Sequence, residues 1–239
     1  MLIRKISIFI TIFAIVGAST TACDFSENTR RRVVSEYNYS FEPASILQSI
    51  FEEEQNVFSE VNINSEPSII ESQSVLWDQS DYLQLVDAFH EYVWNESVDT
   101  WSLNYMSLSL SCNQIGKGFL SASFSYFQET PARDEGSEIE HQIDIYPGRR
   151  LINAWEFAYE SRLFRGRNVT ISTAVLSAND ALMIAENAGG LQERLSLNNK
   201  CEISVILAPN SVNNLEWKVL YSPQAFSITL DSVSGKPVK

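Results

Sequence analysis

The clearest pattern in the chain is a strict alternation of apolar and polar residues between positions 106 and 126. Apolar side chains there alternate with serines, in two stretches separated by a short break. A period of two is typical of a strand that packs with one face and presents a polar face on the other side. The apolar positions are Met106, Leu108, Leu110, Cys112, Leu120, Ala122, Phe124 and Tyr126, and the alternation continues at Ile139, Ile143, Ile145, Trp155, Phe157 and Tyr159.

Three other stretches have the periodicity of a helix. We expect a first helix over residues 43–59, with a proline in its first turn. A second helix is predicted to begin near Ser80, and its apolar stripe consists of Tyr82, Leu85, Val86, Phe89 and Val93. A third helix begins after Ser177 with a capping box completed by Asp180, and Gly189 and Gly190 are predicted to stop it.

With the remaining predicted elements, the same order of strands and helix occurs twice along the chain. Strands are predicted over residues 68–77 and, after the third helix, over residues 201–208, 215–221 and 225–231. We expect a loop over residues 129–138 and a turn over residues 147–150. A strand, a helix and three strands thus follow one another in both halves. We therefore expect an α+β protein with two modules, each a helix on an antiparallel sheet, over residues 43–165 and 166–239.

The first 22 residues have the features of an export signal. Arg4 and Lys5 form a positive start, and the apolar run of residues 6–16 is about half of the roughly 20 residues that a membrane-spanning helix needs. Small residues then lead to Cys23. Residues 23–42 are polar and lack a periodic apolar face, which predicts a flexible tether.

The residues around the end of this signal resemble the lipobox of bacterial lipoproteins. Thr21, Ala22 and Cys23 fit that pattern, whereas Thr20 stands where a Leu, Val or Ile is usual. The resemblance implies that Cys23 receives a diacylglycerol and becomes the N-terminus of a protein anchored on the extracytoplasmic side of a membrane. The alternatives are an ordinary signal peptide that is cleaved nearby and a segment that is retained as an anchor.

The last quarter of the chain resembles a PepSY-like domain. Three segments carry the resemblance, in the family's order and spacing: residues 177–190, SANDALMIAENAGG; 217–221, WKVLY; and 228–238, ITLDSVSGKPV. It implies a helix packed on a small antiparallel sheet, an arrangement also called cystatin-like. The family occurs in exported proteins and protease propeptides, where inhibition of a peptidase has been proposed, so it implies a binding module rather than a catalyst.

Charge and composition narrow the possible functions further. The chain has 17 basic and 30 acidic residues and a formal net charge of −13. Loss of Arg4 and Lys5 with the signal would make the mature chain still more acidic, at −15. This balance argues against binding to nucleic acid, whose phosphates require a basic surface. The two histidines of the chain cannot form a histidine-rich metal site.

Neither histidine stands in a catalytic pattern. His90 opens the sequence HEYVW, which has the first half of the zincin motif, but Trp94 occupies the position of the second zinc ligand. We therefore expect His90 at or near the surface. His141 shares a strand face with Ile139 and Ile143, which predicts a partly buried, hydrogen-bonded histidine. Glu140 and Asp144 are predicted on the polar face of that strand. No catalytic residue, metal site or cofactor is expected.

These observations predict a non-catalytic envelope lipoprotein that binds or restrains a protein partner, with a peptidase as the specific candidate. The alternative is a carrier of a small ligand, with its pocket between a helix and a curved sheet. A hydrolase is a third, weaker possibility.

The cysteine count adds one structural prediction. Export places the chain where thiols often pair, and lipidation of Cys23 would leave two cysteines. We expect a disulfide between Cys112 and Cys201, which would join the two modules. The alternative is two separate buried thiols.

Overall fold

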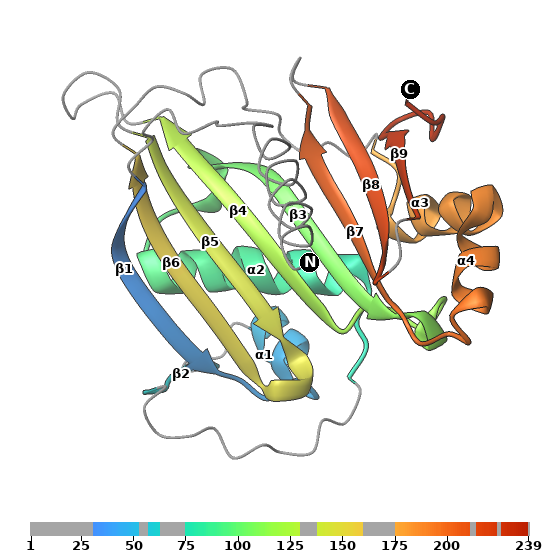
Figure 1. Cartoon of the computed structure of the whole chain (residues 1–239). Coiled ribbons are helices and arrows are strands. Elements are labelled where there is room, and N and C mark those ends of the chain that lie inside the picture. Colours follow the sequence, from blue (N-terminus) through green and yellow to red (C-terminus); the bar gives the residue numbers. More distant parts are fainter. Residues whose placement is uncertain are drawn as a thin grey trace, which may run out of the picture. The chain divides into compact units, whose positions relative to one another are not determined.

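Nine antiparallel strands form a single sheet in the computed structural model of the protein (Figure 1), which describes residues 31–52, 57–62, 75–129, 138–159, 175–210, 214–223 and 226–238. Their spatial order is β2-β1-β6-β5-β4-β3-β7-β8-β9. The strands are β1 Arg31–Ser40, β2 Ser59–Glu60, β3 Ser102–Ser111, β4 Ser121–Glu129, β5 Glu138–Tyr146, β6 Leu151–Tyr159, β7 Glu202–Pro209, β8 Leu215–Ser222 and β9 Ser227–Asp231. The helices are α1 Ile46–Phe51, α2 Gln79–Trp94, α3 Ala178–Ala185 and α4 Leu191–Ser196.

The expectation of two separate helix-on-sheet modules is wrong. Strand β3 pairs with β4 on one side, where Leu108 faces Ala122, and with β7 on the other, where Leu108 faces Val205. The strands of both halves therefore belong to one sheet, and residues 31–239 form one compact unit. An alternating pattern indicates a strand and its buried face, but it does not indicate which strand lies along each edge.

The expected tether of residues 23–42 also needs correction, because residues 31–40 form β1. This strand pairs along its length with β6, and Tyr37 and Tyr39 pack against the core. Its register shifts between Val33 and Ser35. A bulge of this kind adds one residue and breaks the period of two, so the sequence showed no regular apolar face.

One long helix covers the core face of the sheet. In α2, Tyr82, Leu85, Val86 and Phe89 are fully buried, as the apolar stripe predicted. The helix begins at Gln79, and its N-cap is Asp78 rather than Ser80: the Asp81 carboxylate accepts the Asp78 N–H at 3.1 Å as part of a capping box. Helix α1 is shorter than the predicted 43–59. Of the predicted strand 68–77 only residues 75–77 are described, and Trp77 bridges Phe119 there.

The structure describes only the ends of the predicted loop 129–138 but all of the predicted turn 147–150. Residues 130–137, most of the predicted loop 129–138, lie outside the described ranges. The predicted turn 147–150 is confirmed as a short 3-10 turn, Pro147–Arg149.

The C-terminal helix begins where the sequence predicted. The Ser177 hydroxyl accepts the Asp180 N–H at 3.1 Å and caps α3. The predicted stop is a kink instead: Gly189 adopts a φ of 135°, and after Gly190 the chain continues into α4. A side chain at Gly190 would place its Cβ 2.3 Å from the Tyr221 hydroxyl, so only glycine fits there.

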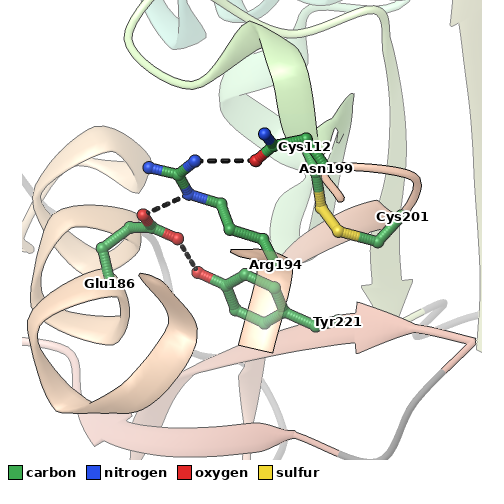
Figure 2. A network of polar contacts seen from close by, with 6 residues as sticks. All are labelled: Cys112, Glu186, Arg194, Asn199, Cys201 and Tyr221. Atoms are coloured by element: carbon green, nitrogen blue, oxygen red, sulfur yellow. Dashed lines mark hydrogen bonds and ion pairs between the residues drawn. A yellow bond between two sulfur atoms is a disulfide. The ribbon is translucent and has the colours of Figure 1, made fainter. Parts of the chain in front are cut away.

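The predicted disulfide between Cys112 and Cys201 is present in the structure (Figure 2). It joins the end of β3 to the start of β7, 89 residues later, with the two Cα atoms 5.2 Å apart. The Cys112 N–H also donates to the Cys201 carbonyl at 2.9 Å. The bond therefore fastens the two neighbouring strands that connect the halves of the sheet.

A polar network closes the space between α4 and β8 beside the disulfide (Figure 2). The buried Glu186 carboxylate accepts the Tyr221 hydroxyl and the Arg194 Nε–H, both at 2.7 Å. Arg194 also donates to the Asn199 side chain at 2.8 Å. Because this buried carboxylate has both a cation and a hydroxyl beside it, its burial is compensated.

Candidate functional site

The face of the sheet opposite α2, here called the open face, has a polar row that crosses five strands. The pairing register places Asn38, Asn153, Asp144, Ser123 and Ser107 side by side, from β1 to β3. The Ser123 hydroxyl donates to the Asp144 carboxylate at 2.6 Å. The serines that alternate along β3 and β4 therefore lie where the sequence predicted, on the polar face.

A hollow of about 430 Å³ opens on this face, beside the polar row. It extends over the start of β3, the end of β4, the start of β5 and the ends of β6 and β7. Its volume is within the range of small-ligand sites. The lining residues are Asn104, Tyr105, Ser123, Ser125, Phe127, Glu140, Gln142, Tyr159, Ala208 and Pro209.

Two lining side chains are nearly buried and have unused hydrogen-bonding capacity. Asn104 and Ser125 are each only 6% exposed. Within the described ranges, neither the Asn104 amide nor the Ser125 hydroxyl makes a hydrogen bond to another residue. Both side chains line the hollow, and their polar atoms are not among the fully enclosed ones, so they can bind water or a ligand that enters it.

A bulge explains how Asn104 reaches the hollow. The register between β3 and β4 shifts between Leu103 and Tyr105, so Asn104 is the extra residue. Bulges commonly redirect a side chain next to a functional site. The sequence identified the strand and its serines, but nothing in it marked the position of the bulge.

The hollow also has three aromatic rings and one carboxylate. Tyr105, Phe127 and Tyr159 supply the rings, and Glu140 supplies the carboxylate. The Tyr159 hydroxyl donates a short hydrogen bond to Glu140. Glu140 lies on the polar face of β5, as predicted, yet it is only 6% exposed.

A second polar cluster lies inside the core and contains both histidines of the chain. His141 on β5 and His90 on α2 contact each other, with Nδ1 of His141 2.9 Å from Nε2 of His90. The His141 ring is stacked between Trp94 and Trp101, at centroid distances of 3.7 and 3.8 Å. His141 is buried as predicted, but the expected surface position of His90 is wrong, because His90 is also fully buried.

The surroundings of the pair assign its tautomers. Nε2 of His141 lies 3.6 Å from a Glu156 carboxylate oxygen, which favours a proton on that nitrogen. Nδ1 of His141 then accepts the Nε2–H of His90, so each ring carries one proton, on Nε2. Both rings are therefore neutral.

Burial of this pair shifts both pKa values downwards. Burial lowers the pKa of His90 to about 4, and the nearby Glu96 backbone offsets only part of that shift. Burial, together with the charge that His90 would carry, lowers the pKa of His141 to about 2. The unfolded chain takes up these protons near pH 6.5, whereas the folded chain does not.

Acid should therefore destabilise the fold through this pair. As the pH falls below about 6.5, each histidine is expected to remove roughly 1.4 kcal/mol of stability per pH unit, until the folded pKa is reached. The measurement is urea unfolding at about pH 7 and about pH 5. The variant His141→Gln should show about half of the pH dependence of the wild type. Burial raises the pKa of Asp87, which stabilises the fold as the pH falls, but this effect is the same in the wild type and the variant. Equal pH dependence in the two proteins would contradict the assignment.

The described residues contain neither a cluster of metal ligands nor a membrane-spanning helix. Among them, no group of three or more His, Cys, Asp or Glu side chains could hold a metal ion. Trp94, at the position where the zincin motif would have its second ligand, stacks on His141 instead. None of the helices in the described ranges is long and apolar enough to cross a membrane.

The space between α2 and the sheet is filled by aromatic packing. Phe89 contacts Tyr39 and Phe58, at centroid distances of 5.4 and 5.0 Å. A carrier was expected to hold its ligand in that space, but the hollow lies on the opposite face. The arrangement therefore supports binding at the open face. Neither a protein-family model nor a curated protein sequence matches the chain.

Proposed function

We propose that the protein is a non-catalytic lipoprotein of the cell envelope, and that it binds a segment of a protein partner in the hollow of the open face. The observation that carries this proposal is the pair of nearly buried, unpartnered polar side chains, Asn104 and Ser125, in the wall of that hollow. The hollow is lined by residues of five strands, so a chain segment that lies across these strands can place one side chain in it.

The resemblance of residues 177–238 to PepSY-like domains supports a protein partner and gives a peptidase as the specific form of this proposal. In this chain the corresponding residues form α3, α4 and β7–β9. Helix α3 packs on the core face, which is the opposite side of the sheet from the hollow. Strand β7 contributes Ala208 and Pro209 to the lining of the hollow. Binding at the hollow would therefore engage residues of both halves of the chain.

The lipid anchor would keep this surface close to the membrane. Strand β1 begins at Arg31, so residues 24–30 are all that separate the lipidated Cys23 from the sheet. Fully extended, such a connection spans at most about 25 Å. A partner that reaches the hollow would therefore also lie at the membrane surface.

Lipid labelling of cells tests whether Cys23 carries the anchor. Cells that express the protein are labelled with a palmitate analogue, and the label is expected on the wild-type chain but not on Cys23→Ser. The variant should move from the membrane fraction to the soluble fraction. An unlabelled, soluble wild-type protein would contradict the anchor.

A small-ligand carrier is the second candidate, because a hollow of about 430 Å³ also suits a small molecule. Native mass spectrometry of protein purified from membranes in mild detergent separates the two. A complex with the added mass of a second protein supports the proposal. Retention of a small molecule alone would favour the carrier instead.

A further inference from the structure

We infer that the hollow recognises a carboxamide side chain of the bound segment, that of a glutamine or an asparagine, an inference that rests on the proposed function. Three neutral polar groups of the lining carry it: the Asn104 amide, the Tyr105 hydroxyl and the Ser125 hydroxyl. Asn104 and Ser125 are each 6% exposed, and Tyr105 is partly buried. Within the described ranges, none of these three side chains makes a hydrogen bond to another residue.

The bulge in β3 brings the three groups together. Tyr105 and Ser125 are direct partners across β3 and β4, and Asn104 is the extra residue beside this pair. In a bulge, two residues of one strand lie opposite one residue of the other strand. Opposed residues on one face have their Cβ atoms about 5 Å apart. A ligand group of a few atoms can therefore contact all three side chains.

The hydrogen-bonding capacity of these side chains selects a ligand group with both donors and acceptors. The Asn104 amide has two donors and an oxygen acceptor, and each hydroxyl can donate or accept. A lysine or arginine side chain has only donors and an ionised carboxylate has only acceptors, so each would leave part of the Asn104 amide without a partner. A carboxamide has both and can exchange two hydrogen bonds with Asn104.

The shape of a carboxamide side chain separates it from a backbone amide. In a trans peptide group the N–H and the C=O point in opposite directions, so only one of them can reach Asn104. In a glutamine or asparagine side chain, one N–H lies on the same side as the C=O, so both can bond to Asn104 at once. The second N–H of the carboxamide remains for the Ser125 hydroxyl. A side chain of the segment, rather than its backbone, is therefore assigned to these three groups.

The inference is tested with capped amino acids and the full-length lipidated protein in detergent micelles. The probes are the Nα-acetyl methylamides of glutamine and asparagine, of methionine and leucine as their apolar counterparts of similar size, and of lysine. Binding is measured at neutral pH from the NMR shift of the Asn104 side-chain amide. At least one carboxamide is expected to bind about tenfold more tightly than its apolar counterpart, which is the effect of two ordinary hydrogen bonds. Lysine is expected to bind more weakly than that carboxamide, although the net charge of −13 attracts cations.

Two matched variants locate the interaction on β4. Ser125→Ala and Ser121→Ala each remove one hydroxyl from the open face of this strand, but of the two serines only Ser125 lines the hollow. Ser125→Ala is expected to weaken binding of the tighter carboxamide about threefold, and Ser121→Ala less than about 1.5-fold. Equal effects of the two variants would overturn the inference. Binding of both carboxamides no tighter than that of their apolar counterparts, or tighter binding of lysine, would also overturn it.

The comparison of probes uses the wild-type protein alone, so it does not depend on how the variants fold. A failure of this inference can also be told apart from a failure of the proposed function. If native mass spectrometry shows a protein complex while neither carboxamide binds, only the carboxamide assignment is wrong. If it shows a retained small molecule and no protein, the proposed function itself is wrong.

Discussion

Removal of the Cys112–Cys201 disulfide is expected to lower the free energy of unfolding by about 4–5 kcal/mol. The bond closes a loop of 89 residues, and in the chain-entropy model a cross-link over that length restricts the unfolded chain by this amount. The two cysteines also lie at the junction of β3 and β7, where the halves of the sheet meet. Loss of the bond should therefore affect the whole sheet.

The measurement is urea unfolding of Cys112→Ala/Cys201→Ala against the wild type, both with Cys23→Ser so that the anchor is absent from the comparison. Peptide mapping without reductant shows whether the bond exists in protein taken from the envelope. Recovery of both cysteines as free thiols, or a loss of stability below about 1 kcal/mol, would contradict the role given to the disulfide.

Shortening Leu182 to alanine is expected to destabilise the protein by roughly 2–5 kcal/mol. Leu182 is 1% exposed on α3, in the layer that covers the buried face of β8, which carries Trp217, Val219 and Tyr221. A buried leucine that is cut back to alanine loses its transfer free energy and leaves a cavity, which gives an effect of this size.

The neighbouring residue supplies the control for this helix. Met183 is 49% exposed, so Met183→Ala should change the stability by less than about 0.5 kcal/mol. Urea unfolding of the two variants measures the difference. Similar stabilities for Leu182→Ala and Met183→Ala would mean that α3 packs on the sheet with another face.

The sequence predicted the local elements well where their periodicity was unbroken. The apolar stripe of α2, the alternation in β3 and β4, the capping box at Ser177 and the pairing of Cys112 with Cys201 all follow from side chains close in sequence or from the cysteine count. Strand β1 was missed because a bulge after Val33 shifts its alternation. The single sheet was missed because the pairing of β3 with β7 joins residues about 100 positions apart.

The candidate site was predicted only in part. The serines of β4 and the carboxylate of Glu140 indicated a polar face, and the structure places them there. The turning of Asn104 into the hollow depends on a bulge, and the meeting of His90 with His141 depends on how α2 crosses the sheet. Neither arrangement leaves a periodic signal in the sequence, because both are set by tertiary packing.

Photocrosslinking in cells tests most directly whether the open face is the binding surface. A photoreactive phenylalanine analogue is placed at Ser107 on β3, in the polar row beside the hollow, or at Gln84, an exposed position on α2. The proposed function predicts a discrete adduct with one protein from position 107, mapped by mass spectrometry to one segment of that protein, and no such adduct from position 84. An adduct from position 84 alone would contradict it, because the partner would then bind the helical side.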